Sequence, residues 1–225
     1  MKSISKPLFG ALVVLLTAGA NMANAAIAIT EVAPWGSGNA PYASDWFELT
    51  NTGASAVSIT GWKMDDSSPS FATAVALTGI SSIAAGESVI FLESSVNASF
   101  LSSWFGAAGK PGLQIGNYSG SGVGLSASGD AVNIYNAAGV LQASVNFGAS
   151  DSTSPYQSFD NSAGLNNTTI SQLSATGVNG AFVALNDAAE IGSPGTIAAV
   201  PEASSLAMLL AGLGLMGVIA RKRAA

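Results

Sequence analysis

The sequence of 225 residues contains no cysteine and no histidine, and only 9% of its residues are charged. The lack of cysteine excludes disulfides, thiolate metal sites and cysteine nucleophiles. The lack of histidine excludes a Ser-His-Asp triad. A Ser-Lys pair would need Lys63 or Lys110, and both positions are typical of solvated side chains. The commonest hydrolase mechanisms therefore have no residues to carry them.

Basic residues are scarce between the two ends of the sequence. Lys63 and Lys110 are the only two there, against twelve acidic residues. A surface with this excess of negative charge repels nucleic acid, so the sequence predicts no DNA or RNA partner.

The first 25 residues have the layout of a secretory signal peptide. Two lysines precede an apolar run over residues 8–20, and small residues at Ala23 and Ala25 frame a cleavage site. The apolar run is too short for a comfortable membrane span, which favours cleavage by signal peptidase. We therefore predict an exported protein whose mature chain starts at Ala26.

The other end has a second membrane-directed pattern. Residues 196–203 read as a linker that contains Pro201 and Glu202, and the uncharged residues 204–220 predict a transmembrane helix. The basic cluster Arg221, Lys222 and Arg223 lies in a tail, residues 221–225, that is expected on the cytoplasmic side. This orientation leaves the residues before the helix outside the inner membrane, in agreement with the signal peptide.

The Pro-Glu pair, the apolar helix and the basic cluster together resemble the PEP-CTERM sorting signal of Gram-negative bacteria, although Ala203 replaces the final proline of its Pro-Glu-Pro motif. The resemblance implies recognition, and removal of the tail, by an exosortase-type membrane enzyme. It also implies transient anchoring in the inner membrane, a final place at the cell surface or outside the cell, and a bacterium that makes exopolysaccharide or biofilm.

Between the ends, residues 26–195 predict one all-β domain. Residues 45–66 read as two strands joined by a turn, because Phe47 and Leu49 alternate with polar or aromatic neighbours, and Trp62 alternates with Lys63 before Met64. Such alternation suits a sheet with one buried face. Many short strands with Gly or Pro between them favour a β-sandwich.

Several local patterns refine this picture. Residues 97–105 predict one short helix with Asn97 as its N-cap, and residues 131–135 and 140–147 predict a hairpin. Residues 148–164 are expected to form a loop, and no strand is expected from Ala188 onward.

The order of motifs also resembles the lamin-tail domain family. The similar stretches begin with Asp45-Trp46-Phe47-Glu48-Leu49, continue through Ala85-Gly86-Glu87 and Gly129-Asp130, and close with Gly192-Ser193-Pro194-Gly195. The resemblance implies an immunoglobulin-like β-sandwich in a module that has no shared catalytic residues.

Three functional hypotheses remain open. The first is a non-enzymatic structural or adhesive surface protein that contacts exopolysaccharide or other surface proteins. The second is a binding module with Ca²⁺ at Asp65, Asp66 and Asp130, or with carbohydrate on loop aromatics such as Trp35, Tyr42, Tyr118 and Tyr156. The third is a hydrolase with a carboxylate pair. Apart from this Ca²⁺ candidate, no cofactor, metal site or catalytic residue is predicted.

Overall fold

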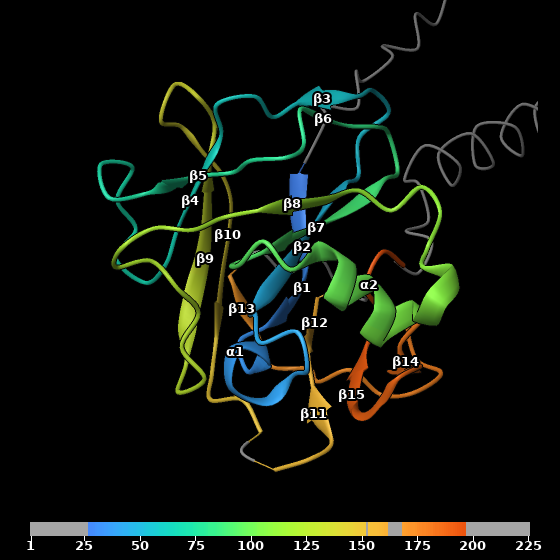
Figure 1. Cartoon of the computed structure of the whole chain (residues 1–225). Helices are drawn as coiled ribbons and strands as arrows, with labels where there is room; N and C mark the ends of the chain where they lie inside the picture. Colours follow the sequence, from blue (N-terminus) through green and yellow to red (C-terminus); the bar gives the residue numbers. More distant parts are fainter. Residues whose placement is uncertain (1–26, 152, 162–167, 197–225) are drawn as a thin grey trace, which may run out of the picture.

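Two β-sheets form the framework in the computed structural model, which describes residues 27–151, 153–161 and 168–196 (Figure 1). The first sheet has the strand order β12 (Phe159–Asp160), β1 (Ile27–Ala33), β2 (Trp46–Asn51), β7 (Ser88–Leu92) and β8 (Ile115–Asn117). The second has the order β13 (Thr169–Ile170), β10 (Leu141–Phe147), β9 (Asp130–Tyr135), β4 (Lys63–Asp65) and β5 (Val75–Ala76).

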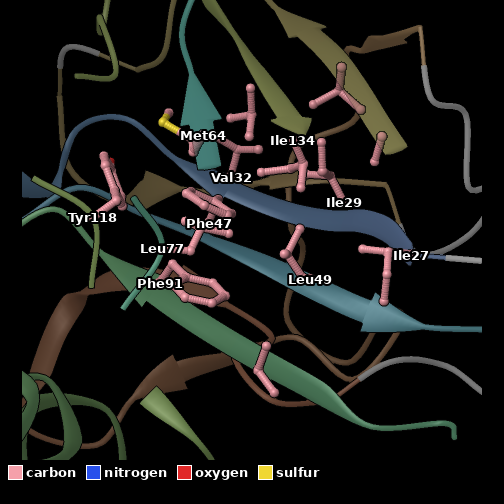
Figure 2. Packing of buried hydrophobic residues seen from close by; sticks show 14 of the residues in the cluster. Ile27, Ile29, Val32, Phe47, Leu49, Met64, Leu77, Phe91, Tyr118 and Ile134 are labelled. Carbon is pink, nitrogen blue, oxygen red and sulfur yellow. The ribbon is translucent and has the colours of Figure 1, made fainter. Parts of the chain in front are cut away.

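The main core lies between these two sheets. Phe47 and Leu49 of β2 point into it, and Phe47 stacks on Phe91 of β7 with 5.6 Å between ring centroids. Met64 and Ile134 reach the same core from the second sheet (Figure 2). The period-two alternation of apolar side chains thus produces a sandwich, as the sequence predicted.

The interpretation of residues 45–66 as one strand pair is wrong. β2 lies in the first sheet, whereas β4 lies in the second, and the intervening β3 (Val57–Ser58) pairs with β6 (Ser82–Ile83) in a separate ribbon. A turn closed by the Trp62 amide on the Ile59 carbonyl, with Gly61 at φ 77°, redirects the chain between the sheets. Local alternation cannot reveal this change of sheet.

The outer face of the first sheet is also covered. The covering layer consists of α1 (Gly36–Asn39), α2 (Asn97–Phe105), η1 (Gly106–Ala108) and the sheet β11 (Tyr156–Gln157), β15 (Asp187–Gly192), β14 (Phe182–Ala184). Trp46 packs edge-to-face on Phe100 and on Trp104 of α2. Every residue of β2 is therefore buried, so the expectation of one buried face is wrong.

Two segments expected to lack strands contain them. β12 and β11 fall within residues 148–164, and β15 extends past Ala188. Their sequences carry little alternation, and they form strands because β1, β15 and β14 are available as pairing partners.

The helix and the hairpin are confirmed. α2 spans residues 97–105, and β9 pairs antiparallel with β10. The N-cap prediction is wrong, because Val96 occupies that position and Asn97 is the first helical residue. The Asn97 side chain instead donates from Nδ2 to the Ile115 carbonyl (3.2 Å), and its Oδ1 accepts from the side chain of Asn117 (3.1 Å). These bonds tie the helix to β8.

Candidate functional site

Two glutamates stand side by side on the outer face of the first sheet. Glu31 of β1 and Glu48 of β2 are register partners, and both side chains are fully buried. A β-bulge between Ile29 and Glu31 turns Glu31 away from the main core. Half of this outer face is aromatic, around Trp46, and the other half is built on this acid pair.

Each carboxyl group holds part of the chain between Ser193 and Thr196. Glu31 accepts hydrogen bonds from the Ser193 amide (2.7 Å) and hydroxyl (3.0 Å), and from the Ser158 hydroxyl. Glu48 accepts from the Gly195 amide (2.6 Å) and from the Thr30 hydroxyl (2.5 Å). The acid pair thus captures two backbone donors of one turn.

Lys110 holds the same turn from the other side. Its ammonium donates to the carbonyls of Pro194 (3.0 Å) and Gly195 (2.7 Å) and to the hydroxyl of Thr196 (2.6 Å). It also lies 5.3 Å from the centroid of the Phe105 ring, within cation–π range. We call Glu31, Glu48, Lys110 and residues 193–196 the clasp.

Two glycines make the clasp possible. A Cβ on Gly192 would stand 2.6 Å from Oε1 of Glu31, so a larger residue would force this buried carboxyl out of its position. Gly195 has φ 69°, in the left-handed region that other residues rarely adopt. The closing Gly-Ser-Pro-Gly motif therefore has a physical reason in this fold.

Burial shifts the titration of all three ionisable groups of the clasp. It raises the pKa of Glu31 to about 8, helped by the nearby charge of Glu48, and it raises the pKa of Glu48 itself to about 7. Hydrogen bonds to the charged forms oppose both shifts, as does Lys110 for Glu48. Burial lowers the pKa of Lys110, while the two glutamates counteract that shift.

A cavity of about 290 Å³ opens beside the clasp. Its lining consists of Gly86, Glu87, Ser88, Lys110, Pro111, Gly112, Leu113 and Gly195. The two buried carboxyls are not exposed in it, and their oxygens are occupied by donors of the protein itself. This arrangement suits holding a chain segment in place, and it gives a substrate no access to the acid pair.

A third buried glutamate, Glu190, lies under the aromatic half of the face. The Tyr42 hydroxyl donates to Glu190 (3.2 Å) and accepts from the indole N–H groups of Trp46 (3.1 Å) and Trp104 (3.3 Å). Burial and the neighbouring Asp187 raise the pKa of Glu190 to about 8. A protonated Glu190 suits this apolar setting.

The three predicted Ca²⁺ ligands organise turns. Asp65 is buried, and its carboxylate accepts from three donors of the following loop, in Ser68, Ser70 and Thr73. Asp66 accepts from the Ser68 amide (3.1 Å). Asp130 accepts from the amides of Ser67 (3.0 Å), Ala131 (2.8 Å) and Ser126 (2.9 Å). In the described residues no three such side chains form a group suited to a metal ion, and Ca²⁺ binding stays a prediction.

The aromatic residues considered for carbohydrate stacking lie mostly inside the protein. Trp35, Tyr42 and Tyr118 are buried, and the partly exposed Tyr156 stacks on Trp35 with 5.7 Å between centroids. Their burial leaves no open aromatic platform among these four residues.

The clasp was not predicted from the sequence. Lys110, expected to be solvated, is half-buried and fully engaged, so that expectation is wrong. The sequence did offer one signal, because Glu31 and Glu48 each lie inside an apolar strand. An unpaired charge is costly in such a place, so partners for both carboxyls could have been expected.

The predicted sorting residues lie outside the described residues. These are Ala23, Ala25, Pro201, Glu202, Arg221, Lys222 and Arg223, together with the signal peptide and the transmembrane helix 204–220. Within residues 27–151, 153–161 and 168–196, no helix is long and apolar enough to cross a membrane.

The facing sheets and the order of their strands define an immunoglobulin-like β-sandwich. The family model described as Lamin Tail Domain matches residues 20–149, more than half of the sequence, so the chain belongs to this family. The PEP-CTERM protein-sorting motif matches residues 199–224. No curated protein matches the sequence.

The sorting motif implies an exported protein that an exosortase-type enzyme processes during membrane-associated sorting to the cell surface. The lamin tail domain is a structural domain and not a known enzyme family. The family match ends at residue 149. The clasp therefore joins β1 and β2, which lie within the match, to residues 193–196, which lie between the match and the sorting motif.

Proposed function

We propose that the protein is a non-enzymatic structural or adhesive component of the cell surface or extracellular matrix, in an exopolysaccharide or biofilm setting. A signal peptidase removes residues 1–25, and the helix 204–220 holds the domain at the inner membrane until an exosortase-type enzyme removes the tail. The observation that carries this proposal is the sorting motif at residues 199–224, immediately after a sandwich of a structural family.

The chemistry of the described residues supports a scaffold. The buried carboxyls of Glu31, Glu48 and Asp65 and the half-buried ammonium of Lys110 are all used in contacts within the chain. A buried, hydrogen-bonded charge network that holds loops to strands contributes to one defined shape. Such a domain can present its loops and sheet edges to polymers outside the cell.

Deletion of residues 201–225 tests the sorting part of the proposal. We expect the shortened protein to leave the membrane fraction and accumulate unanchored in the medium, because its membrane helix is gone. A matched variant replaces Arg221, Lys222 and Arg223 with glutamine and keeps the apolar segment; it should be exported but processed poorly. Unchanged membrane retention of the deletion variant would contradict the proposal.

The adhesive role needs a separate experiment. A strain that lacks the protein should form a weaker biofilm, and the full-length gene should restore it while the deletion variant should not. Titration of the purified exopolysaccharide into the mature protein should show saturable heat if contact is direct. Glycan cleavage that disappears when Glu31 or Glu48 is replaced by glutamine would overturn the non-enzymatic assignment.

A further inference from the structure

The clasp holds the described residues that precede the sorting motif in sequence, and we call Thr196 the exit point. Thr196 is the last described residue, and its hydroxyl is held by Lys110 at 2.6 Å. Its amide also donates to the Ser193 carbonyl (2.8 Å). Glu48 and Lys110 bind the amide and the carbonyl of the neighbouring Gly195. The sorting motif begins three residues further on, at residue 199.

The chain between this point and the motif is short. From Thr196 to Pro201 there are five residue steps, which span at most about 17 Å when fully extended. A domain of about 170 residues has a diameter of about 40 Å. A membrane enzyme that binds the motif therefore lies against the part of the sandwich that surrounds the exit point.

That part of the surface is hollowed. The cavity of about 290 Å³ includes Gly195 in its lining, so it opens at the exit point itself. Gly86 and Gly112 line it in left-handed conformations, with φ 73° and 86°, and each has open space where a Cβ would stand. We call the cavity lining, together with the exposed neighbour Ala85, the exit face.

The exit face differs in charge from the rest of the domain. Its charged side chains are Lys110 and Glu87, one of each sign. Glu87 is occupied by the Ala84 amide (2.6 Å) and the Gln114 amide group (2.8 Å). The sequence between the two ends otherwise has one basic residue against eleven acidic ones. The exit face thus has no net formal charge, so its own side chains do not repel an anionic membrane surface.

We propose that the exit face is the docking surface for the membrane-embedded sorting enzyme that processes the tail, with the clasp positioning the tail for it. This inference rests on the proposed function. The enzyme binds the sorting motif that follows Thr196 in sequence and contacts the cavity rim with its parts outside the membrane. The short connection makes the two contacts one binding event.

The test uses the full-length chain in its host and measures the rate of tail removal by pulse labelling. The double variant Ala85→Glu, Pro111→Glu adds bulk and charge at two exposed positions of the exit face. We expect roughly ten-fold slower tail removal, which corresponds to about 1.4 kcal/mol. The matched control Ala138→Glu, Val140→Glu adds the same charge at the exposed β9–β10 turn, which lies on the other side of the molecule in Figure 1, and should react at the normal rate.

A linker separates docking from other defects. Insertion of about twelve Gly and Ser residues after Thr196 adds about 20 Å of reach, so the enzyme no longer has to touch the exit face. With this linker the exit face no longer contributes, so we expect the linked exit-face variant and the linked unmodified sequence to be processed at the same rate. A normal rate in the exit-face variant without the linker, or a rate difference that remains when both carry the linker, would overturn the inference.

A folding control and the unmodified sequence distinguish failure of the docking inference from failure of the proposed function. If circular dichroism shows that the double variant has lost its fold, Ala85→Glu alone is used and interpreted in the same way. If the unmodified chain shows no tail removal, the proposed function fails. If the unmodified chain is processed and the exit-face variant is processed equally fast, only the docking inference fails.

Discussion

Glu31 and Glu48 face each other across β1 and β2, and both carboxyls bind the same turn at residues 193–196. Two buried acids side by side repel each other when both are charged, so the pair retains a proton near neutral pH. Lys110 completes the arrangement by binding the carbonyls of that turn. The described chain next to the sorting motif is thus attached to the first two long strands of the fold.

The first prediction concerns pH. The pKa is raised from 4.5 to about 8 for Glu31 and Glu190 and to about 7 for Glu48, chiefly by burial. Between about pH 4.5 and pH 8 the folded state binds more protons than the unfolded chain, so the free energy of unfolding falls as pH rises. The stabilisation by these protonated glutamates is complete below about pH 4.5. By about pH 8 we expect the free energy of unfolding, measured by urea denaturation, to be a few kcal/mol lower.

A glutamine variant provides the control for this pH dependence. Glu31→Gln keeps the shape of the side chain but does not titrate, so its stability should change less between about pH 5 and pH 8. If the free energy of unfolding of the unmodified protein stays level or increases over this interval, burial does not destabilise the charged forms of these glutamates and the prediction is wrong.

Much of the fold could be predicted from the sequence because its cause is local. Phe47, Leu49 and Met64 lie in the core at the positions that strand alternation assigns to them. The order of motifs was sufficient to indicate the lamin tail domain. These features need only the side-chain pattern of a short stretch.

The clasp could not be predicted because its contacts are far apart in sequence. Lys110 bonds residues more than 80 positions later, and Glu31 bonds Ser193 across 162 positions. Lys110 sits in a loop before a proline, which has no periodicity to interpret. The covering strand β15 has a weak pattern of its own and depends on its partners.

The second prediction tests Lys110. Lys110→Met leaves the carbonyls of Pro194 and Gly195 without their donor, so we expect a loss of about 1–3 kcal/mol and faster amide hydrogen exchange in residues 187–196. The matched control is Lys63→Met, because the Lys63 ammonium only lies over the Phe71 ring, 4.7 Å from its centroid. This variant should lose less than about 1 kcal/mol of unfolding free energy. Equal effects of the two variants would contradict the role of the clasp.

The third prediction concerns Asp65. Its carboxylate accepts from the Ser68 hydroxyl (2.6 Å), the Ser70 amide (2.7 Å) and the Thr73 hydroxyl (3.2 Å). Asp65→Ala removes all three bonds at a buried position and should cost about 2–3 kcal/mol even with a chelator present. Asp66→Ala, the control, removes one exposed bond and should cost less than about 1 kcal/mol.

Calcium titration of the same proteins examines the predicted metal site. A rise in melting temperature with Ca²⁺ that disappears in both aspartate variants would establish binding by Asp65 and Asp66. A loss of stability in Asp65→Ala that is equal with and without Ca²⁺ would leave only the structural role.

The fourth prediction compares two buried tyrosines. The Tyr118 hydroxyl is buried in the main core and has no hydrogen-bond partner among the described residues, whereas the Tyr42 hydroxyl bonds Glu190, Trp46 and Trp104. Burial of an unpaired hydroxyl is unfavourable, so Tyr118→Phe should be neutral or stabilising. Tyr42→Phe leaves two indole N–H groups unpaired and should cost about 1–3 kcal/mol in urea denaturation. Both variants remove one oxygen atom from a ring that stays buried, so the opposite order of stabilities would mean that Tyr118 has a partner and Tyr42 does not need one.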